Sequence, residues 1–494
     1  MTSLPAEIYA VDSVRNIDSA AINDAGIGGY TLMTRAGAAA LAAIRAQFPD
    51  AKRWQIVCGS GNNGGDGYVV ARLAAEQGIA VSVLAVSPAE KLSGDAATAY
   101  MDFAALGGAV AAYDGSLDDA AELLVDGLLG SGLERDVEGT YAEVVNAMNA
   151  HGAPVVALDI PSGLHGDSGA VMGVAVRADL TVTFVGLKSG LYLDSGPEYA
   201  GDIVFADLEI PAECRAAQAP IMRRIDDRIL RQALPKRKRS AHKGKFGHVL
   251  IVGGGLGMPG AVRLCGEAAL RAGAGLVSVA THPVHAAQIP ATRPELMCHG
   301  VESAERLLPL LEKATTVAVG PGLGDTAWSK ELLDAVLASE RPLVVDADAL
   351  NLLADRDLDR ADWILTPHPG EAARLLGSSP SDVQADRRSA LAGLAEKFGG
   401  TIVLKGSGTL VSAKKGPPWL CSAGNPGMAS AGMGDVLTGI IAALRAQKMS
   451  AELAAIVGVQ VHAEAGDAAA ADGERGLIAS DLLLHVRAGV NPWR

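Results

Sequence analysis

The stretch WQIVCGSGNNGGDGYVVARLAAEQG, residues 54–78, contains the pattern that decides the fold. It begins with a short apolar run typical of a buried strand, passes through a glycine-rich turn, and ends in a helical segment. A second apolar run, VSVLAV at residues 81–86, follows almost directly. Strand, helix and strand in this order predict a βαβ unit with two parallel strands.

The same alternation continues along the chain and restarts once. Further apolar runs lie at residues 123–129, 154–160, 180–186 and 202–208, and then at 248–254, 275–281, 316–322, 342–348, 363–368 and 401–407. Between the two series, residues 212–247 change in character, and we place a boundary near Ile225. The sequence therefore predicts two α/β domains, 1–224 and 225–494, each a doubly wound sheet with helices on both faces.

Composition excludes several classes of protein. The chain has 494 residues, 49% of them hydrophobic, and a net charge of −14, which disfavours broad binding to nucleic acid. The first basic residue, Arg15, is followed by no apolar run, and no run reaches membrane-spanning length. Five scattered cysteines without a CxxC pair indicate reduced thiols. We therefore expect a cytoplasmic protein with no membrane partner.

One basic cluster, Lys236–Arg239, stands out against the acidic chain. The sequence alone allows a nuclear signal or a nucleic-acid arm, but a solvated loop is the simpler interpretation. A phosphate-facing role for Lys243 or Lys245 is a third alternative.

Three polar clusters in the first half follow predicted strands. They are GSGNNGGDG at residues 59–67, GLLGSGLERD at 127–136 and LDIPSGLHGD at 158–167. Ligands of open α/β sheets bind beyond the carboxyl ends of the strands, so this edge is predicted to be a site. Asn63, Asp126 and Ser162 supply oxygen atoms with few carboxylates, which suits a monovalent hard cation, although each residue could instead cap a turn.

The second half carries a pattern suited to phosphoryl transfer. In AGMGDVLTG, residues 431–439, Asp435 follows Gly434 at a predicted helix start, where free N–H groups stabilise phosphoryl charge. Asp435 could take the proton of an attacking hydroxyl. The strand-end loop LKGSGTLV, at 404–411, suits a nucleotide phosphate, and TPHPGE and GPGLG add further polar and glycine-rich strand ends.

The motifs of the first half resemble the NAD(P)H-hydrate epimerase domain over about residues 10–215, by LMTRAG, GSGNNGGDG, VDGLLGSGL and LDIPSGL. Ser131 departs from the usual threonine but keeps the hydroxyl. The resemblance implies a Rossmann-like three-layer α/β/α domain, catalysis by Asp159, and potassium at Asn63, Asp126 and Ser162. The substrate-binding residues that it implies are Asn62, Asn63, Gly64, Gly65, Asp66, Gly130, Ser131, Gly132, Leu133, Glu134, Arg135, Asp136 and Asp159.

The second half resembles the ADP-dependent NAD(P)H-hydrate dehydratases of the ribokinase-like superfamily, over about residues 226–490, by GPGLG, DADALN, TPHPGE, KGSGT and GMGDVLTG. Gly255 and Met258 depart mildly from that pattern. The resemblance implies a ribokinase-like α/β domain with Asp435 as the catalytic residue and Mg²⁺ beside the phosphates, its waters oriented by Asp346, Asp348 or Glu371. The implied substrate-binding residues are Ala261, Gly322, Gly324, His368 and Asp435, and the implied nucleotide-binding residues are Lys405, Gly406, Ser407, Gly408, Thr409 and Gly434.

Together the two resemblances imply a bifunctional metabolite-repair enzyme. The first domain would epimerise the 6-hydroxy adducts NADHX and NADPHX, and the second would dehydrate the S epimer with ADP, giving NAD(P)H, AMP and phosphate. A homo-oligomer, a tetramer or an octamer, is also implied. The alternative is a small-molecule kinase that uses Asp435, joined to a non-catalytic N-terminal binding domain.

Overall fold

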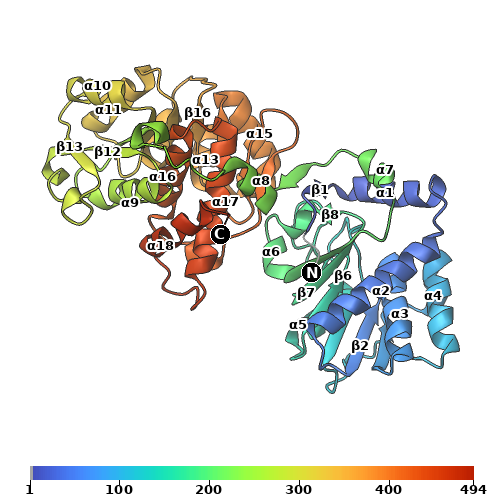
Figure 1. The fold of residues 1–494 in the computed structure, drawn as a ribbon. Coiled ribbons are helices and arrows are strands. Elements are labelled where there is room, and N and C mark those ends of the chain that lie inside the picture. The colour runs from blue at the N-terminus through green and yellow to red at the C-terminus, as the bar shows by residue number, and fades with distance from the viewer. Residues whose placement is uncertain (1–3, 494) are drawn as a thin grey trace. The chain divides into compact units, whose positions relative to one another are not determined.

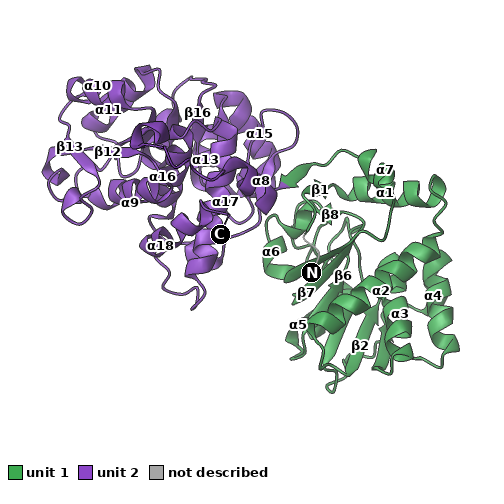
Figure 2. Ribbon diagram, viewed as in Figure 1, with its two compact units in different colours: residues 1–223 green, residues 224–494 purple. Residues whose placement is uncertain are grey.

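The computed structural model describes residues 4–493, which fall into two compact units divided between residues 223 and 224 (Figure 2). Each unit contains a run of parallel strands and its own hydrophobic core. Among the described residues, none of the helices is long and apolar enough to cross a membrane.

The first unit is built on a parallel sheet in the order β4-β3-β2-β5-β6-β7-β9. Its strands β2, β6 and β7 are labelled in Figure 1. From β2 the chain builds outward through β3 and β4, then returns to the other side of β2 with β5. The loops after β2 and β5 therefore leave in opposite directions, which opens a crevice at their carboxyl ends. The strands are β2 Arg53–Cys58, β3 Ala80–Ala85, β4 Ala109–Ala112, β5 Leu123–Gly127, β6 Val155–Leu158, β7 Leu180–Phe184 and β9 Asp202–Ala206.

Helices cover both faces of this sheet. Ile56 and Val125 belong to the core formed with α2 and α3, whereas their neighbours Val57 and Leu124 belong to the core formed with α5. Alternate residues of each buried strand thus serve opposite layers, and the predicted three-layer arrangement is confirmed. The helices are α1 Val11–Asn23, α2 Gly29–Gln47, α3 Asn62–Glu76, α4 Gly94–Ala105, α5 Gly139–Ala150, α6 Gly196–Tyr199 and α7 Ala212–Ala216.

Three short strands of this unit fall outside the predicted series. They are β1 Glu7–Tyr9, β8 Leu187–Lys188 and β10 Met222–Arg224. β1 pairs in parallel with β8, opposite Lys188 at Tyr9, and antiparallel with β10. Because α1 begins two residues after β1, this pairing fixes Lys188 and the start of α1 relative to each other.

The second unit has a sheet in the order β13-β12-β11-β14-β15-β16-β17-β18-β19, parallel from β13 to β17 and antiparallel beyond. Its strands are β11 His248–Val252, β12 Leu276–Thr281, β13 Met297–Gly300, β14 Thr316–Val319, β15 Leu343–Val345, β16 Trp363–Leu365, β17 Thr401–Leu404, β18 Thr409–Val411 and β19 Trp419–Cys421. The parallel part repeats the predicted βα alternation, and the antiparallel turn from β17 to β18 carries the loop at residues 405–408.

On one face of this sheet, α9, α16, α17 and α18 pack over a core that includes Val249, Val279 and Ile440. α16 contacts both α9 and α17, so its N-terminus is held at the carboxyl edge of the sheet. The helices are α8 Asp227–Ala233, α9 Pro259–Arg271, α10 Ala304–Lys313, α11 Ala327–Ala338, α12 Ala347–Leu353, α13 Pro369–Leu376, α14 Pro380–Ala385, α15 Arg387–Phe398, α16 Met433–Ala446, α17 Ala451–Ala469 and α18 Ala479–Gly489.

Candidate active sites

A cavity of about 860 Å³ lies at the carboxyl edge of the first sheet. Its walls come from α1, α2, the start of α3 and the loops after β5, β6 and β7. The structure brings most of the residues predicted there together. The predicted residues that line it are Asn62, Asn63, Asp66, Gly130, Ser131, Gly132, Leu133, Glu134, Arg135 and Asp159, whereas Gly64, Gly65 and Asp136 do not line it.

Gly64 and Gly65 allow close packing around the start of α3. α3 begins at Asn62, so both glycines lie in its first turn. A Cβ on Gly64 would collide with the carbonyl oxygen of Gly59, and one on Gly65 would lie 2.6 Å from Met33 Cε. The two glycines let α3 start close against the strand-end backbone and α2, which places the flanking Asn63 and Asp66 at the cavity.

Asp159 projects from the end of β6 and is paired with a lysine that the sequence analysis missed. Its backbone is left-handed, with φ 66°. Lys188, only 1% exposed, donates through Nζ to Asp159 Oδ1, to Thr183 Oγ1 at 3.1 Å and to the carbonyl oxygen of Phe184 at 2.9 Å. The one signal for Lys188 in the sequence is its place shortly after a predicted strand.

Two further carboxyl groups of the cavity, Asp18 and Asp66, have raised pKa values. Burial raises the pKa of Asp18 to about 6, with Lys188 lowering it and Asp159 raising it. Burial, followed by the charges of Asp159 and Asp18, raises the pKa of Asp66 well above its usual range. Only Lys188 opposes these effects on Asp66. The cavity therefore combines an ion-paired carboxylate with carboxyl groups that retain protons more readily.

The three predicted cation ligands are buried together beside the cavity. Ser162 donates to Asp126 Oδ1 through Oγ at 2.6 Å and to Oδ2 through its N–H at 2.8 Å. Asn63 donates through Nδ2 to the carbonyl oxygen of Leu129 at 2.9 Å, while its buried Oδ1 has no hydrogen-bond partner among the described residues. Burial raises the pKa of Asp126 to about 6, although Ser162 and Leu128 lower it through hydrogen bonds. An unsatisfied carbonyl oxygen beside a buried carboxylate fits a bound cation.

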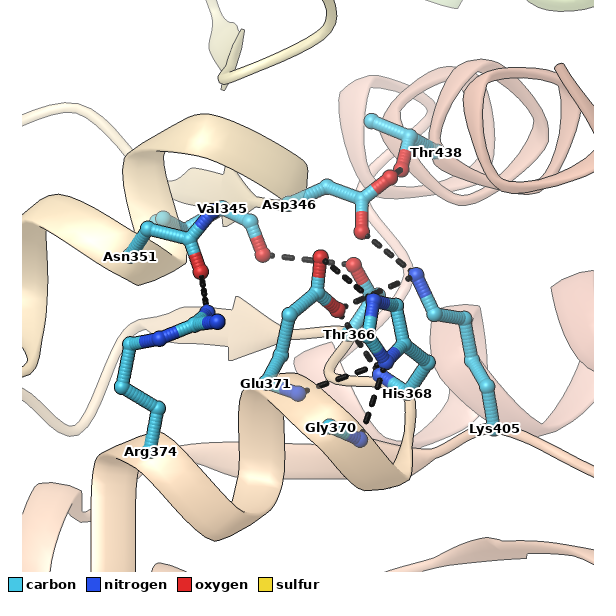
Figure 3. A network of polar contacts seen from close by, with 10 residues as sticks. All are labelled: Val345, Asp346, Asn351, Thr366, His368, Gly370, Glu371, Arg374, Lys405 and Thr438. Atoms are coloured by element: carbon cyan, nitrogen blue, oxygen red, sulfur yellow. Dashed lines mark hydrogen bonds and ion pairs between the residues drawn. The ribbon is translucent and has the colours of Figure 1, made fainter. Parts of the chain in front are cut away.

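In the second unit, Asp346 and Lys405 form the centre of a polar network (Figure 3). Lys405 Nζ donates to Asp346 Oδ1 at 2.8 Å and lies 3.7 Å from Glu371 Oε2. Thr438, on α16, donates to Asp346 Oδ2 at 2.8 Å. Burial alone would raise the pKa of Asp346, but Lys405 and these hydrogen bonds hold it below its usual value.

His368 is held at the start of α13 in the same network. Its Nδ1 accepts from the N–H groups of Gly370 and Glu371, at 3.0 and 3.3 Å, and its Nε2 lies 3.4 Å from Glu371 Oε1. Burial and the charge of Lys405 lower the pKa of His368, although Asp346 raises it. The ring is half exposed, and its lowered pKa favours the neutral imidazole.

Asp435 lies beside this network in the first turn of α16. Gly432 precedes the helix with φ 91°, and a Cβ on Gly434 would lie 3.4 Å from both Asp346 Oδ2 and Lys405 Nζ. Burial, followed by the charge of Asp346, raises the pKa of Asp435 to about 7, while Lys405 lowers it. Two aspartates of one site therefore differ in their readiness to hold a proton.

The predicted glycine-rich contacts converge on the same place. The loop after β11 bonds to the loop after β14, since Gly255 donates to the carbonyl oxygen of Gly322 at 2.7 Å. A Cβ on Gly322 would lie 3.1 Å from that of Ala261. Gly324 donates to Asp348 Oδ2 at 2.8 Å, and the charge of Asp348 also raises the pKa of Asp435.

The loop from Lys405 to Thr409 joins β17 to β18 and is anchored by a buried arginine. Arg387, 3% exposed, donates through Nη2 to the carbonyl oxygens of Leu404, Lys405 and Gly408, at 3.2 to 3.3 Å. The exposed Ser407 lies in the loop between these anchored carbonyl groups. Arg387 was not predicted, because it lies on α15, outside any strand-end motif.

Comparison with known proteins agrees with both halves. A family model described as NAD(P)H-hydrate dehydratase matches residues 249–486, and one described as YjeF-related protein N-terminus matches residues 29–190. A bifunctional NAD(P)H-hydrate repair enzyme of Coxiella burnetii is 48% identical over 98% of this chain and 99% of its own length. The chain belongs to the bifunctional NAD(P)H-hydrate repair enzymes. The family that the motifs resemble is thereby confirmed.

Other members of this family support the same conclusion. The bifunctional repair enzyme of Escherichia coli is 42% identical over 99% of this chain and 95% of its own length. Among solved structures, a ribokinase-like superfamily protein of Enterococcus faecalis is 30% identical with a TM-score of 0.50, and it covers 55% of this chain and 95% of its own. The ribokinase-like fold expected for the second half is confirmed.

No protein cluster for magnesium is found in the second site. Among residues 4–493, no group of three or more His, Cys, Asp or Glu side chains is placed to hold a metal ion. Asp346 and Glu371 are bonded within the network, and Asp348 accepts from Gly324. Their expected role in orienting the waters of a magnesium ion stays a prediction.

Proposed function

We propose that the first unit interconverts the R and S epimers of NAD(P)H hydrate, and that the second unit dehydrates the S epimer with ADP. The products are NAD(P)H, AMP and phosphate. The observation that supports both halves best is the repeated pairing of a strand-end aspartate with a buried lysine, Asp159 with Lys188 and Asp346 with Lys405. In the first site the proton-transfer group, Asp159, is a member of the pair, and in the second site Asp435 lies beside the pair.

In the first site, Asp159 acts as acid and base at C6: it gives a proton to the departing 6-hydroxyl oxygen and takes one from the water that re-enters. The ring nitrogen donates its lone pair as the C6–O bond breaks, leaving a planar cation that water re-enters from either face. Lys188 binds Asp159 Oδ1, and the N–H of Ser131 approaches Oδ2 at 3.4 Å. The lysine thus orients the carboxylate and leaves Oδ2 as its reactive oxygen.

A potassium ion at Asn63, Asp126 and Ser162 would support this site without entering the reaction. The ion would satisfy the free Oδ1 of Asn63 and neutralise the buried Asp126. Leu129, which begins the substrate loop, bonds to both Asn63 and Ser162. The bound ion would therefore fix the loop that carries Gly130 to Arg135.

In the second site, Asp435 accepts the proton of the 6-hydroxyl as its oxygen attacks the terminal phosphorus of ADP. The bond from that phosphorus to AMP breaks, and the N-terminus of α16 stabilises the phosphoryl charge. Phosphate then leaves C6 with the bonding electrons, pushed out by the ring nitrogen, and loss of the C5 proton restores the double bond. Phosphorylation converts hydroxide, a poor leaving group, into a good one.

The residues from Lys405 to Thr409, together with Gly434, are proposed to hold the adenine nucleotide. Ala261, Gly322, Gly324 and His368 are proposed to hold the hydrated nicotinamide. Magnesium, where present, would screen the nucleotide's phosphates. Two contacts support these assignments: Lys405 is bonded to Asp346 and Gly324 to Asp348, and the charges of Asp346, Lys405 and Asp348 all act on Asp435.

Incubation with mixed NADPHX epimers and ADP tests the proposal. Both epimers should disappear, while dihydronicotinamide absorbance and free phosphate rise in equal amounts. Without ADP, the two epimers should equilibrate and no NADPH should form. A stable phosphate ester in place of free phosphate would instead identify a small-molecule kinase. The preference for ADP is tested in parallel with ATP at matched concentration, where comparable turnover would overturn it.

A further inference from the structure

Epimerisation at a single ring carbon poses a geometric problem for the first site. When hydroxide leaves from one face of the ring and water enters from the other, protons must be moved on both faces. Asp159 lies at the end of β6, and Lys188 and Ser131 fix its position. A carboxylate held in this way reaches one face of a bound ring. A second proton-transfer group is therefore needed on another wall of the cavity.

Helix α1 supplies such a wall. Val14, Asp18 and Ile22, spaced four residues apart, all line the cavity and so form one stripe of the helix. Of the three, only Asp18 can transfer a proton. Within residues 4–493, Asp18 has neither a hydrogen bond nor an ion pair, although it is largely enclosed, so its carboxyl group is available to a ligand.

The position of Asp18 is fixed from both sides. At the start of α1, the N–H of Val11 donates to Asp167 Oδ1 at 2.8 Å, which ties the helix to the loop that follows β6. β1, just before α1, pairs with the strand that ends in Lys188. The helix that carries Asp18 is therefore anchored to the two segments that carry Asp159 and Lys188.

We propose that Asp18 is the second catalytic carboxyl group of this site and serves the ring face opposite to that served by Asp159. This inference rests on the proposed epimerase function. In one direction, Asp18 donates its proton to the 6-hydroxyl oxygen, the C6–O bond breaks, and water leaves with that electron pair. The lone pair of the ring nitrogen forms the C6–N double bond. A second water then attacks C6 on the other face, returns the π pair to nitrogen, and gives a proton to Asp159.

The reverse direction uses the same two groups with their roles exchanged. After one turnover Asp18 is ionised and Asp159 is protonated. Proton exchange with water, or reaction of the opposite epimer, returns both groups to their initial protonation states. The electrostatics agree with this division. Asp159 is the carboxylate that is paired with Lys188, whereas burial raises the pKa of Asp18 to about 6, near the working range of an acid catalyst.

The test compares the full-length Asp18→Asn variant with Asp24→Asn. Asp24 is an exposed residue just beyond the same helix, so its substitution controls for the loss of a carboxylate near α1. We expect Asp18→Asn to slow interconversion of the epimers by about 10²–10⁴-fold. Asp24→Asn should match wild type, and ADP-dependent dehydration of the S epimer should be unchanged in both variants. Unchanged dehydration shows that the second unit is intact, and a thermal unfolding curve equal to that of wild type shows that the first unit of Asp18→Asn is folded.

Two further measurements keep the proposal open to contradiction. Asp18→Glu should recover part of the rate, because it restores a carboxyl group to the same wall, whereas a purely structural aspartate would not be replaced by the longer side chain. In H₂¹⁸O, each interconversion by the wild-type protein should place a solvent oxygen at C6. Retention of the original oxygen would overturn the step.

The outcomes separate this inference from the function on which it rests. If the wild-type protein does not interconvert the epimers, the epimerase function itself fails. If wild type interconverts them and Asp18→Asn does so within about threefold, only the role of Asp18 is wrong. If Asp66→Asn loses the activity while Asp18→Asn keeps it, the second carboxyl group is Asp66, on α3, and the proposal is overturned.

Discussion

Asp346 and Asp435 show how one site gives two neighbouring aspartates different tasks. The charge of Lys405 holds the pKa of Asp346 below its usual value despite burial, while burial and the charge of Asp346 raise the pKa of Asp435 to about 7. Asp346 is therefore a permanent anion that anchors Lys405 and Thr438. Asp435 can exchange a proton near neutral pH, as a general base must.

The raised pKa of Asp435 predicts how dehydration depends on pH. A base must be ionised, so the rate should be at its plateau above pH 7 and fall about tenfold per pH unit below it. Asp435→Asn should lower the rate by about 10²–10⁴-fold and remove this limb. Initial rates of NADPH formation between pH 5.5 and 9 measure both effects. Epimerisation by the same preparation serves as the control, and a variant with a normal rate would contradict the assignment.

Asp126 carries a second prediction, which concerns potassium. The pKa of Asp126 is raised to about 6, so its ionised form destabilises the fold above that pH, and a bound cation should offset the cost. At pH 7.5, KCl should raise the melting temperature of the first unit by about 2–4 °C relative to choline chloride, as about 1 kcal/mol of binding would. Asp126→Asn should lose this difference. An equal response to both salts in wild type would count against the potassium site.

At the scale of elements, the sequence predicts the buried strands of both sheets but not the short strands that pair across long stretches of sequence. The apolar runs at residues 54–58 and 155–158 are both buried strands. Such runs can be recognised because a strand covered on both faces needs apolar side chains throughout. Asp159 and Asp435 follow from such patterns, since polar residues at strand ends and helix starts are local signals. The helix that carries Asp18 is joined to the segment that carries Lys188 through the pairing of β1 with β8. These two strands are far apart in sequence and too short to show a period.

The loop between β17 and β18 depends on α15 in the same non-local way. Arg387 accounts for three of the carbonyl groups around this loop, so its removal should loosen the nucleotide site without touching the reacting atoms. Arg387→Met should raise the KM for ADP by about 10–100-fold, the equivalent of one or two charged hydrogen bonds. Arg387→Lys should recover little, because a single ammonium group cannot reproduce the planar guanidinium.

The neighbouring Arg388 provides a matched control for this substitution. Arg388 is exposed on the same helix turn, and Arg388→Met should leave the KM for ADP at the wild-type value. Titration of ADP at saturating NADPHX gives the constants for all three variants. If Arg387→Met kept the wild-type KM, the arginine would be a core residue without influence on the nucleotide loop.

At the scale of the whole molecule, the residues of each site belong to one unit. The first cavity is lined by residues between Val14 and Leu208, and the second network by residues between Ala261 and Thr438. In these contacts, every side chain of a site comes from the unit that contains the site. A substitution in one site should therefore leave the other activity intact, which makes the two reactions separable by single variants.

This separation leads to a prediction about the complete reaction. Asp159→Asn should dehydrate the S epimer but leave the R epimer, and Asp435→Asn should equilibrate the epimers but form almost no NADPH. An equimolar mixture of the two variants with ADP should then consume both epimers, at a rate close to that of wild type at half the total concentration. The physical reason is that the R epimer converted by one chain is released and captured by another.

The mixture also decides whether the converted substrate is released into solution between the two reactions or passes between the sites of one chain. If the R epimer persists in the mixture at the level of Asp159→Asn alone, while wild type consumes it, the converted substrate must pass between the sites of one chain without release. Asp159→Asn alone, followed over the same time, corrects for spontaneous interconversion. Each variant retains one intact site, so both activities are present in the mixture. Persistence of the R epimer would therefore show that covalent linkage of the two units contributes to the rate.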